Sequence, residues 1–196
     1  SSSQITVKAK GRENRISDYK SIIDKIKNAD DTIIHISPAT DASGFIRVGK
    51  ETYPILMRGF DLPLADGIYK LKSAITDGVL PSGEEIILGK ELMEEAGLHT
   101  GDNVEVLTPA GKTKLLKISG VYDLKITSLN KTWVVSNISL VQDIFGFGNQ
   151  ITSIEMQVPE VFNADITGEK LASVLPSDLK VENWKEQNAS LLGGLN

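Results

Sequence analysis

Cysteine is absent from the 196-residue sequence. Its absence excludes disulfides, thiolate nucleophiles and cysteine-based zinc or iron–sulfur sites. It leaves the cellular compartment open, because cytosolic proteins and many bacterial extracytoplasmic domains lack disulfides alike. Histidine is scarce too: His35 and His99 are far apart in the sequence, and no cluster of other metal ligands accompanies either one. We therefore expect no bound metal and no cofactor.

Long hydrophobic runs are also missing. No apolar run approaches the roughly 18–20 residues that cross a bilayer, and the first residues lack the pattern of a signal peptide, so we expect a soluble chain. Hydrophobic residues make up 40% of the sequence and charged residues 24%, which is enough for a packed core. The net charge of -5, with lysine and glutamate interspersed, argues against a nucleic-acid-binding protein.

One short stretch resembles a phosphate-binding loop at first sight. GEEIILGK, residues 83–90, places a glycine ahead of a Gly-Lys pair. A P-loop needs four residues between its glycines and Ser or Thr after the lysine, whereas here five intervene and Glu91 follows. The pattern favours a buried strand leading into a helix that ends at Gly97, a left-handed C-cap. With no nucleophile elbow, dinucleotide fingerprint or distinctive carboxylate pair, the sequence predicts that the chain is not an enzyme.

Apolar periodicity predicts a strand–helix–strand order at both ends of the chain. The predicted elements are strands at 3–9, 31–37, 151–158 and 178–184 and helices at 17–28 and 163–176. Ser17 and Asn163 are the expected N-caps of the two helices. Along 151–158, Ile154, Met156 and Val158 alternate with polar residues, which predicts a half-buried strand. Because such a unit cannot easily bury its sheet alone, the two ends are expected to pair in space.

The residues between the two ends are rich in strand patterns. Extended segments are expected at 43–49, 52–61, 84–88, 103–109, 112–122 and 131–137. Ser139 and Gln142 fit a capping box, with Gly146 as the stop of that helix. The last ten residues predict a weak helix. The fold class is therefore α+β: a compound α/β unit built from both chain ends, with an inserted β-rich unit.

The segment GVLPSGEEIILGKELMEEAGLHTGDNVEVLTPAGKTKLLKISGVYD, residues 78–123, resembles a known family. It is similar to the extracytoplasmic domain of ABC transporter permeases of the MacB and LolC/LolE type, which include the lipoprotein-releasing systems. MRGFD at 57–61, SLVQDIFG at 139–146 and VENWKEQNASLLGGLN at 181–196 match the same family in order. The resemblance therefore spans nearly the whole chain.

The resemblance implies a division of the chain into two units and a cellular location for the domain. Residues 1–60 and 150–196 would form the two halves of a porter-like unit, and residues 61–149 an inserted sabre-like unit. The domain would lie on the extracytoplasmic side of the bacterial cytoplasmic membrane, anchored by flanking membrane helices outside this chain. A cytosolic ABC ATPase, as a subunit or a fused domain, and a second permease protomer would be its partners.

Three functions stay open at this point. The resemblance implies a permease domain that couples cytosolic ATP hydrolysis to the export or release of a lipoprotein, a peptide or a small molecule. An extracytoplasmic sensor or binding module without an ATPase is the alternative. An enzyme that uses scattered carboxylates is the third, and it would need converging carboxylates in a pocket.

Contact residues are expected at strand ends and at one tight turn. The candidates for contact with a partner or substrate are Phe45, Met57, Phe60, Trp184, Thr108, Pro109, Ala110 and Gly111. An ordinary core position is the alternative for each large apolar member. In the lipoprotein-releasing relative that docks a periplasmic carrier, the matching hairpin carries an extended hook. The short turn at 108–112 argues against carrier docking by that route.

Overall fold

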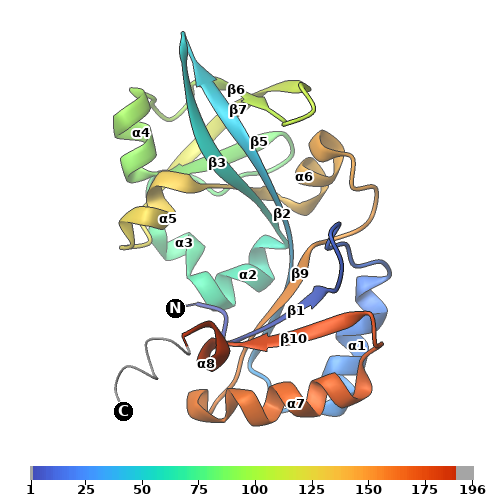
Figure 1. Cartoon of the computed structure of the whole chain (residues 1–196). Helices are drawn as coiled ribbons and strands as arrows, with labels where there is room; N and C mark the ends of the chain where they lie inside the picture. Colours follow the sequence, from blue (N-terminus) through green and yellow to red (C-terminus); the bar gives the residue numbers. More distant parts are fainter. Residues whose placement is uncertain (1, 189–196) are drawn as a thin grey trace.

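One mixed sheet of ten strands runs through residues 2–188, the part of the chain that the computed structural model describes (Figure 1). The strands are β1 (Ile5–Ala9), β2 (His35–Val48), β3 (Glu51–Phe60), β4 (Ile75–Gly78), β5 (Glu85–Gly89), β6 (Asn103–Leu107), β7 (Thr113–Tyr122), β8 (Trp133–Asn137), β9 (Ser153–Gln157) and β10 (Leu179–Asn183). The helices are α1 (Tyr19–Ala29), α2 (Leu62–Tyr69), α3 (Leu71–Ala74), α4 (Lys90–Ala96), α5 (Thr127–Thr132), α6 (Ile138–Phe145), α7 (Ala164–Val174) and α8 (Trp184–Gln187), with a 3₁₀ turn at Val161–Asn163.

Strand β2 belongs to both halves of the sheet. The first half of β2 pairs antiparallel with β9, from His35 opposite Gln157 to Ala39 opposite Ser153. Its second half pairs with β6, with Phe45 opposite Leu107. Strand β3 pairs with β2 along ten residues and continues the same ribbon. The β2–β3 ribbon is therefore the physical link between the two lobes visible in Figure 1.

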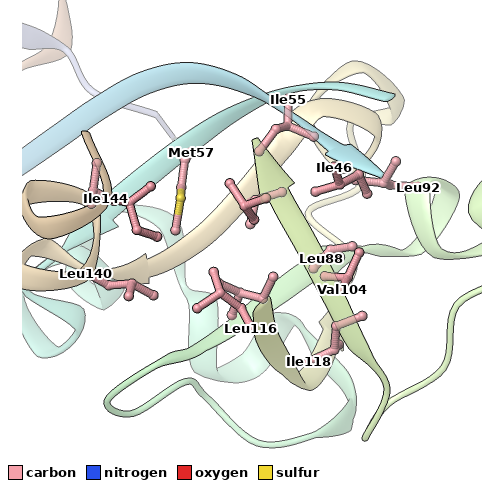
Figure 2. Packing of buried hydrophobic residues seen from close by; sticks show 14 of the residues in the cluster. Ile46, Ile55, Met57, Leu88, Leu92, Val104, Leu116, Ile118, Leu140 and Ile144 are labelled. Carbon is pink, nitrogen blue, oxygen red and sulfur yellow. The ribbon is translucent and has the colours of Figure 1, made fainter. Parts of the chain in front are cut away.

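The strands of the first lobe close into a ring. Strand β3 pairs with β8, β8 with β5, β5 with β7, β7 with β6, and β6 returns to β2. Closure leaves these six strands without a free edge, which removes the unpaired backbone groups that favour aggregation. We call this part the ring lobe. Its interior is filled by apolar side chains, among which Figure 2 shows Met57, Leu88, Val104 and Leu116.

The second lobe is an open sheet in the order β10-β1-β9-β2, and we call it the open lobe. Helices α1 and α7 contact each other and cover its lower face in Figure 1. Ile22 and Ile26 of α1 pack with Leu171 of α7 on the strand residues Val7 and Ile154. The two chain ends thus supply neighbouring strands of one sheet, as the strand–helix–strand patterns predicted.

The α+β class predicted from the sequence is confirmed. The division into residues 1–60, 61–149 and 150–196 stays a prediction. In the structure β2 and β3, both before residue 61, contribute Ile46, Ile55 and Met57 to the core of the ring lobe. The first segment therefore serves both lobes, because the ribbon is long enough to reach from one to the other.

Several local predictions need correction. The segments 31–37 and 43–49, predicted as separate strands, both overlap one strand, β2, which runs without a break from His35 to Val48. Helix α1 begins after Asp18 and not after Ser17, and α6 begins after Asn137, so the capping box of Ser139 is wrong. Asn163 lies at the N-cap position of α7, but its side chain makes no capping hydrogen bond.

Other local predictions are confirmed. Helix α4 ends at Gly97, which has a φ of 66°, and the N–H group of Leu98 donates to the carbonyl of Met93 at 2.9 Å. Helix α6 ends at Gly146 in the same left-handed conformation. The weak helix predicted for the last ten residues stays a prediction, because residues 189–196 lie outside the described residues.

We expect Gly89→Ala to lower the free energy of unfolding by about 3 kcal/mol, because a Cβ at Gly89 would overlap the backbone of the buried Asn130. The control is Gly97→Ala, where the Cβ meets open space and the cost is the left-handed φ alone, about 1 kcal/mol. Urea unfolding followed by circular dichroism measures both. Equal losses of unfolding free energy in the two variants would contradict this prediction, because they would show that β5 and α5 can move apart without an energetic cost.

Candidate functional site

A buried ion-pair cluster lies where the two lobes meet. Arg58 of β3 faces Asp41 directly across the β2–β3 ribbon, and its Nε donates to Asp41 Oδ1 at 2.8 Å. Its Nη2 donates to Glu155 Oε1 of β9 at 2.9 Å, and its Nη1 donates to the hydroxyl of Tyr69 in α2 at 3.2 Å. The Tyr69 hydroxyl in turn donates to Glu155 Oε2 at 2.5 Å. One guanidinium therefore joins three strands and a helix.

The cluster fixes the protonation of Arg58 and Tyr69. Burial disfavours the charged form of Arg58, but the negative charges of Glu155 and Asp41 hold the pKa of its guanidinium well above the usual value. Burial, together with the charge of Glu155, also raises the pKa of the Tyr69 phenol far above its ordinary value. Arg58 remains a cation and Tyr69 a neutral donor. Because Glu155 already accepts two hydrogen bonds, it is poorly suited to act as a general base.

Aromatic rings enclose the guanidinium. The Cζ atom of Arg58 lies 4.5 Å from the ring centroid of Trp133 and 4.8 Å from that of Phe60. Tyr69 meets Trp133 edge to face, with centroids 5.4 Å apart. Such faces attract a cation, and the attraction grows when water is excluded, as it is at Arg58, which is 4% exposed. Apolar packing and charge pairing thus act on the same side chain.

A groove of about 410 Å³ opens over this cluster. Arg58, Tyr69 and Glu155 form part of its wall, and Trp133 and Trp184 line it as well. The groove also reaches Ser2 and Asn188, so it lies where the described chain begins and ends. It combines aromatic faces with paired charges. Its composition suits the binding of an amphipathic group better than proton transfer.

A second cavity, about 600 Å³, lies between the start of β2 and helix α2. His35 lines it, packed so closely on Gly67 that a Cβ at that glycine would overlap the imidazole. His35 is therefore a packed position on a strand, as the sequence indicated. His99 is exposed in the turn after α4, and its backbone N–H donates to Asp102 Oδ2 at 2.8 Å.

Within residues 2–188, the His, Asp and Glu side chains form no group of three or more that could hold a metal ion. The predicted absence of catalysis and of a cofactor stays a prediction.

Two of the sequence-predicted contact residues lie in the core. Met57 is fully buried inside the ring lobe, among the side chains shown in Figure 2, and Phe60 is 1% exposed next to Tyr69. Their predicted role as surface contacts is corrected here, because neither offers surface to a partner. The sequence showed an apolar run ending in a turn, and that pattern does not reveal that helix α6 covers the strand and that residues of α2 pack against Phe60.

Other predicted residues come together at the far end of the ring lobe. Phe45 of β2, 41% exposed, pairs with Leu107 at the end of β6, and the turn of residues 108–111 follows immediately. Thr108 itself is buried, and its Oγ1 accepts from the N–H of Lys112 at 3.0 Å, while Pro109, Ala110 and Gly111 are exposed. We call Phe45 with residues 109–111 the hairpin tip. Its contact role stays a prediction.

Trp184 lies at the opposite end, in the open lobe. Its backbone N–H donates to the carbonyl of Gln4 at 3.0 Å, and its Nε1 donates to the carbonyl of Val161 at 2.7 Å. The ring packs against the core of the open lobe and meets Phe162 edge to face. Trp184 is therefore a half-buried anchor at the chain ends, far from the hairpin tip along the chain path in Figure 1.

The sequence reasoning missed the ion-pair cluster. Glu155 and Ser153 were assigned to the polar face of a half-buried strand, yet both are buried. One signal was available: Arg58 interrupts the apolar run ILMRGF, and an arginine inside a buried strand requires anionic partners. Asp41 is 17 residues away in the sequence, but the second partner, Glu155, is 97 residues away, and a local pattern does not reveal that contact.

Comparison with known proteins gives two kinds of similarity. No family model matches the chain. By sequence, it is 27% identical over 160 residues to the lipoprotein-releasing system transmembrane protein LolC of Xylella fastidiosa, in two strains, which covers 75% of this chain and 38% of that protein. The chain thus spans well under half the length of these curated relatives.

Two solved structures share its fold. The periplasmic region of MacB from Actinobacillus actinomycetemcomitans superposes with a TM-score of 0.67 at 16% identity, covering 97% of this chain and 92% of that one. The extracellular domain of the noncanonic ABC-type transporter YknZ from Gram-positive bacteria gives a TM-score of 0.64 at 15% identity, covering 92% of this chain and 100% of that one. This chain has the fold of a MacB-type extracytoplasmic domain.

The resemblance to MacB- and LolC-type permeases predicted from the sequence is therefore confirmed. The MacB-type fold accounts for the continuous sheet with its ring lobe and open lobe. A domain of a putative permease protein from Porphyromonas gingivalis is also similar, with a TM-score of 0.52 at 10% identity, over 92% of this chain and 86% of that one. At these identities the structural neighbours define the fold and not the substrate.

We expect Arg58→Met to lower the free energy of unfolding by about 3–5 kcal/mol, because it leaves two carboxylates at the lobe junction without their cation. The matched control is Arg47→Met, which breaks the surface pair of Arg47 with Glu105 and costs about 1 kcal/mol or less. Urea unfolding gives both values. Similar losses in the two variants would show that the buried cluster does not stabilise the junction.

The raised pKa of Tyr69 predicts a specific loss of stability in alkali. Above pH 10 an unfolded tyrosine loses its proton while folded Tyr69 keeps it, so the unfolded state binds fewer protons and stability falls as pH rises. Each such tyrosine contributes up to about 1.4 kcal/mol per pH unit. Because an unfolded tyrosine is only half ionised at pH 10, Tyr69→Phe should make the decline between pH 10 and 11 shallower by about 1 kcal/mol. Tyr53→Phe, which changes an exposed hydroxyl, is the control, and an equal effect there would contradict the assignment.

Proposed function

We propose that this chain is the external domain of an ABC transporter permease and that it transmits ATP-driven motion to a substrate outside the membrane. The ATP would be hydrolysed by a cytosolic ATPase subunit or domain. The sequence similarity to LolC and the fold shared with the MacB and YknZ domains support the permease assignment. The name of the LolC relatives makes a lipoprotein one candidate substrate, beside a peptide or a small molecule.

The observation that carries the proposal is the meeting of the two ends of the described chain. Strands β1 and β10 are antiparallel neighbours, with Ile5 opposite Asn183, and the N–H group of Trp184 donates to the carbonyl of Gln4. Segments that precede and follow the domain would leave it side by side. This arrangement suits a domain inserted between two adjacent membrane helices. Within residues 2–188 no helix combines the length and the apolar character needed to span a bilayer.

The shape of the sheet supports a transmitting role. Strand β2 has 14 residues, which at about 3.3 Å per residue extend over roughly 45 Å. It runs from the open lobe, where the chain ends meet, into the ring lobe that carries the hairpin tip (Figure 1). The ion pairs of Arg58 hold β9 and α2 against this ribbon at the junction. A rotation imposed at the chain ends would therefore displace the hairpin tip farther than it displaces residues close to the ends.

We expect the hairpin tip to be accessible from outside the cytoplasmic membrane and to move when ATP binds. The chain has no cysteine, so Ala110→Cys provides one site for a probe, once any cysteines in the rest of the full-length permease are replaced. In spheroplasts a membrane-impermeant maleimide should label this cysteine. In the reconstituted transporter, spin labels on the two protomers should change their separation on addition of ATP and vanadate.

Gln187→Cys, at the chain ends, is the matched control. Its label should shift less than the label at Ala110, because it lies near the origin of the motion. Labelling of Ala110→Cys only after lysis would contradict the extracytoplasmic location. An unchanged separation at both positions, in a transporter with active ATPase, would contradict the coupling and favour a binding module that no ATPase drives.

A further inference from the structure

An exposed apolar patch surrounds the place where the chain ends meet. Val161 and Phe162 lie in the 3₁₀ turn, and Ile166 lies in the first turn of α7. Phe162 is 73% exposed and Ile166 is 62% exposed. The ring of Trp184 in α8 meets Phe162 edge to face, with centroids 5.4 Å apart. We call these four residues the apolar foot.

The polar groups at the apolar foot are already paired, so the foot can enter an apolar environment at little cost. The indole Nε1 of Trp184 already donates to the carbonyl of Val161, so entry into a water-poor layer would leave no indole N–H unpaired. Asp165 and Lys185, the sequence neighbours of Ile166 and Trp184, form an ion pair at 3.1 Å. Phe162 in the 3₁₀ turn and Ile166 in the first turn of α7 are large apolar side chains exposed four residues apart, which is typical of a surface that is covered in its working state.

The positions of the chain ends indicate what covers the apolar foot. Trp184 contacts Val161 through its indole and Gln4 through its backbone, so the apolar foot lies within one hydrogen bond of both ends of the described chain. Relatives of this chain are transmembrane proteins of which it spans 38%, and further chain on either side would start here. Tryptophan concentrates at the boundary between headgroups and acyl chains, and phenylalanine is typical of the apolar face of helices that lie in this interface.

We propose that the apolar foot rests on the lipid bilayer, with Phe162 and Ile166 inserted at the level of the headgroups. This inference rests on the proposed function for its orientation, since a permease domain would present its chain ends to the membrane. Exposed Glu160 and Glu169 flank the foot and would be repelled by anionic lipid. The surface therefore suits zwitterionic headgroups, and its attachment depends on apolar burial and not on charge.

The test uses the fluorescence of Trp184. The chain carries two tryptophans, and Trp133→Phe leaves Trp184 as the reporter. A hexahistidine tag after residue 196 tethers the chain to phosphatidylcholine vesicles that contain a small fraction of nickel-chelating lipid. With brominated acyl chains in the vesicles, emission should be quenched about twofold, the behaviour of an indole at the interface. High salt should leave the quenching unchanged, because apolar contact is not screened.

The double variant Phe162→Ser/Ile166→Ser should lose this quenching. Its matched control is Val79→Ser/Leu115→Ser, which removes two exposed apolar side chains from the ring lobe and should keep it. Circular dichroism checks that each variant folds. If Trp133→Phe does not fold, the difference between the double variant and its control is measured with both tryptophans present.

Three results would overturn the proposal. Quenching that persists in the double variant would come from the tether alone, and quenching that high salt abolishes would be electrostatic. A concentration-dependent dimer in sedimentation that the double variant abolishes would assign the foot to a second copy of the chain. These failures leave the proposed function standing, because its test measures accessibility and motion at Ala110. If lipid contact is observed but the Ala110 test fails, the membrane contact of the apolar foot would stand and the proposed permease role would be wrong.

Discussion

The pairing of one buried guanidinium with two carboxylates and a phenol holds the junction of this domain together. Arg58 lies on β3 and Glu155 on β9, strands that do not pair with each other because β2 runs between them. Backbone hydrogen bonds join each strand to its neighbour, whereas this side chain reaches across a neighbour and joins three strands at once. Burying these charges is costly, and only nearly complete pairing offsets the cost.

Conformational specificity follows from that pairing. Asp41 and Arg58 are opposite each other in the β2–β3 register, so a one-residue slip would turn one of them to the other face of the sheet. Glu155 fixes β9 in the same way, and Tyr69 fixes the position of α2. The ring lobe and the open lobe each have a hydrophobic core of their own. Apolar packing could therefore stabilise each lobe by itself, while the ion pairs determine how the lobes meet.

The sequence predicted what depends on neighbouring residues. Alternation along 151–158 and apolar periodicity along 17–28 predicted the correct elements. Gly97 and Gly146 predicted the correct helix ends, because a left-handed residue is needed there whatever the rest of the fold does. The strand break expected between 37 and 43 was wrong. That segment, SPATDASG, has turn-forming residues, and it stays extended because β9 and β3 pair with it.

The site was beyond local patterns for a related reason. A polar residue that alternates with apolar ones is usually solvent-exposed, and Glu155 follows that pattern while it lies buried beneath Arg58 and Tyr69. Glu155 is buried because α2 covers the face of the sheet on which its side chain lies. The α2 residue that contacts it is more than 80 residues away in the sequence. The pairing of β6 with β2, which closes the ring, is equally non-local. Periodicity indicated that the two chain ends pair, and the family resemblance implied the same architecture, because a resemblance carries long-range order as a whole.

In the proposed role, the two ends of the domain have different physical requirements. Motion that arrives at the chain ends reaches the hairpin tip only if the β2–β3 ribbon between them does not bend. A twisted ribbon of two strands bends easily by itself. Closure into a ring stiffens the upper half of the ribbon, and the cluster around Arg58 stiffens the point where the ring gives way to the open sheet. A foot that rests on lipid would add a support near the origin of the motion. With a support at one end and a rigid sheet above it, a small rotation of flanking helices becomes a larger displacement at Phe45 and the turn beside it.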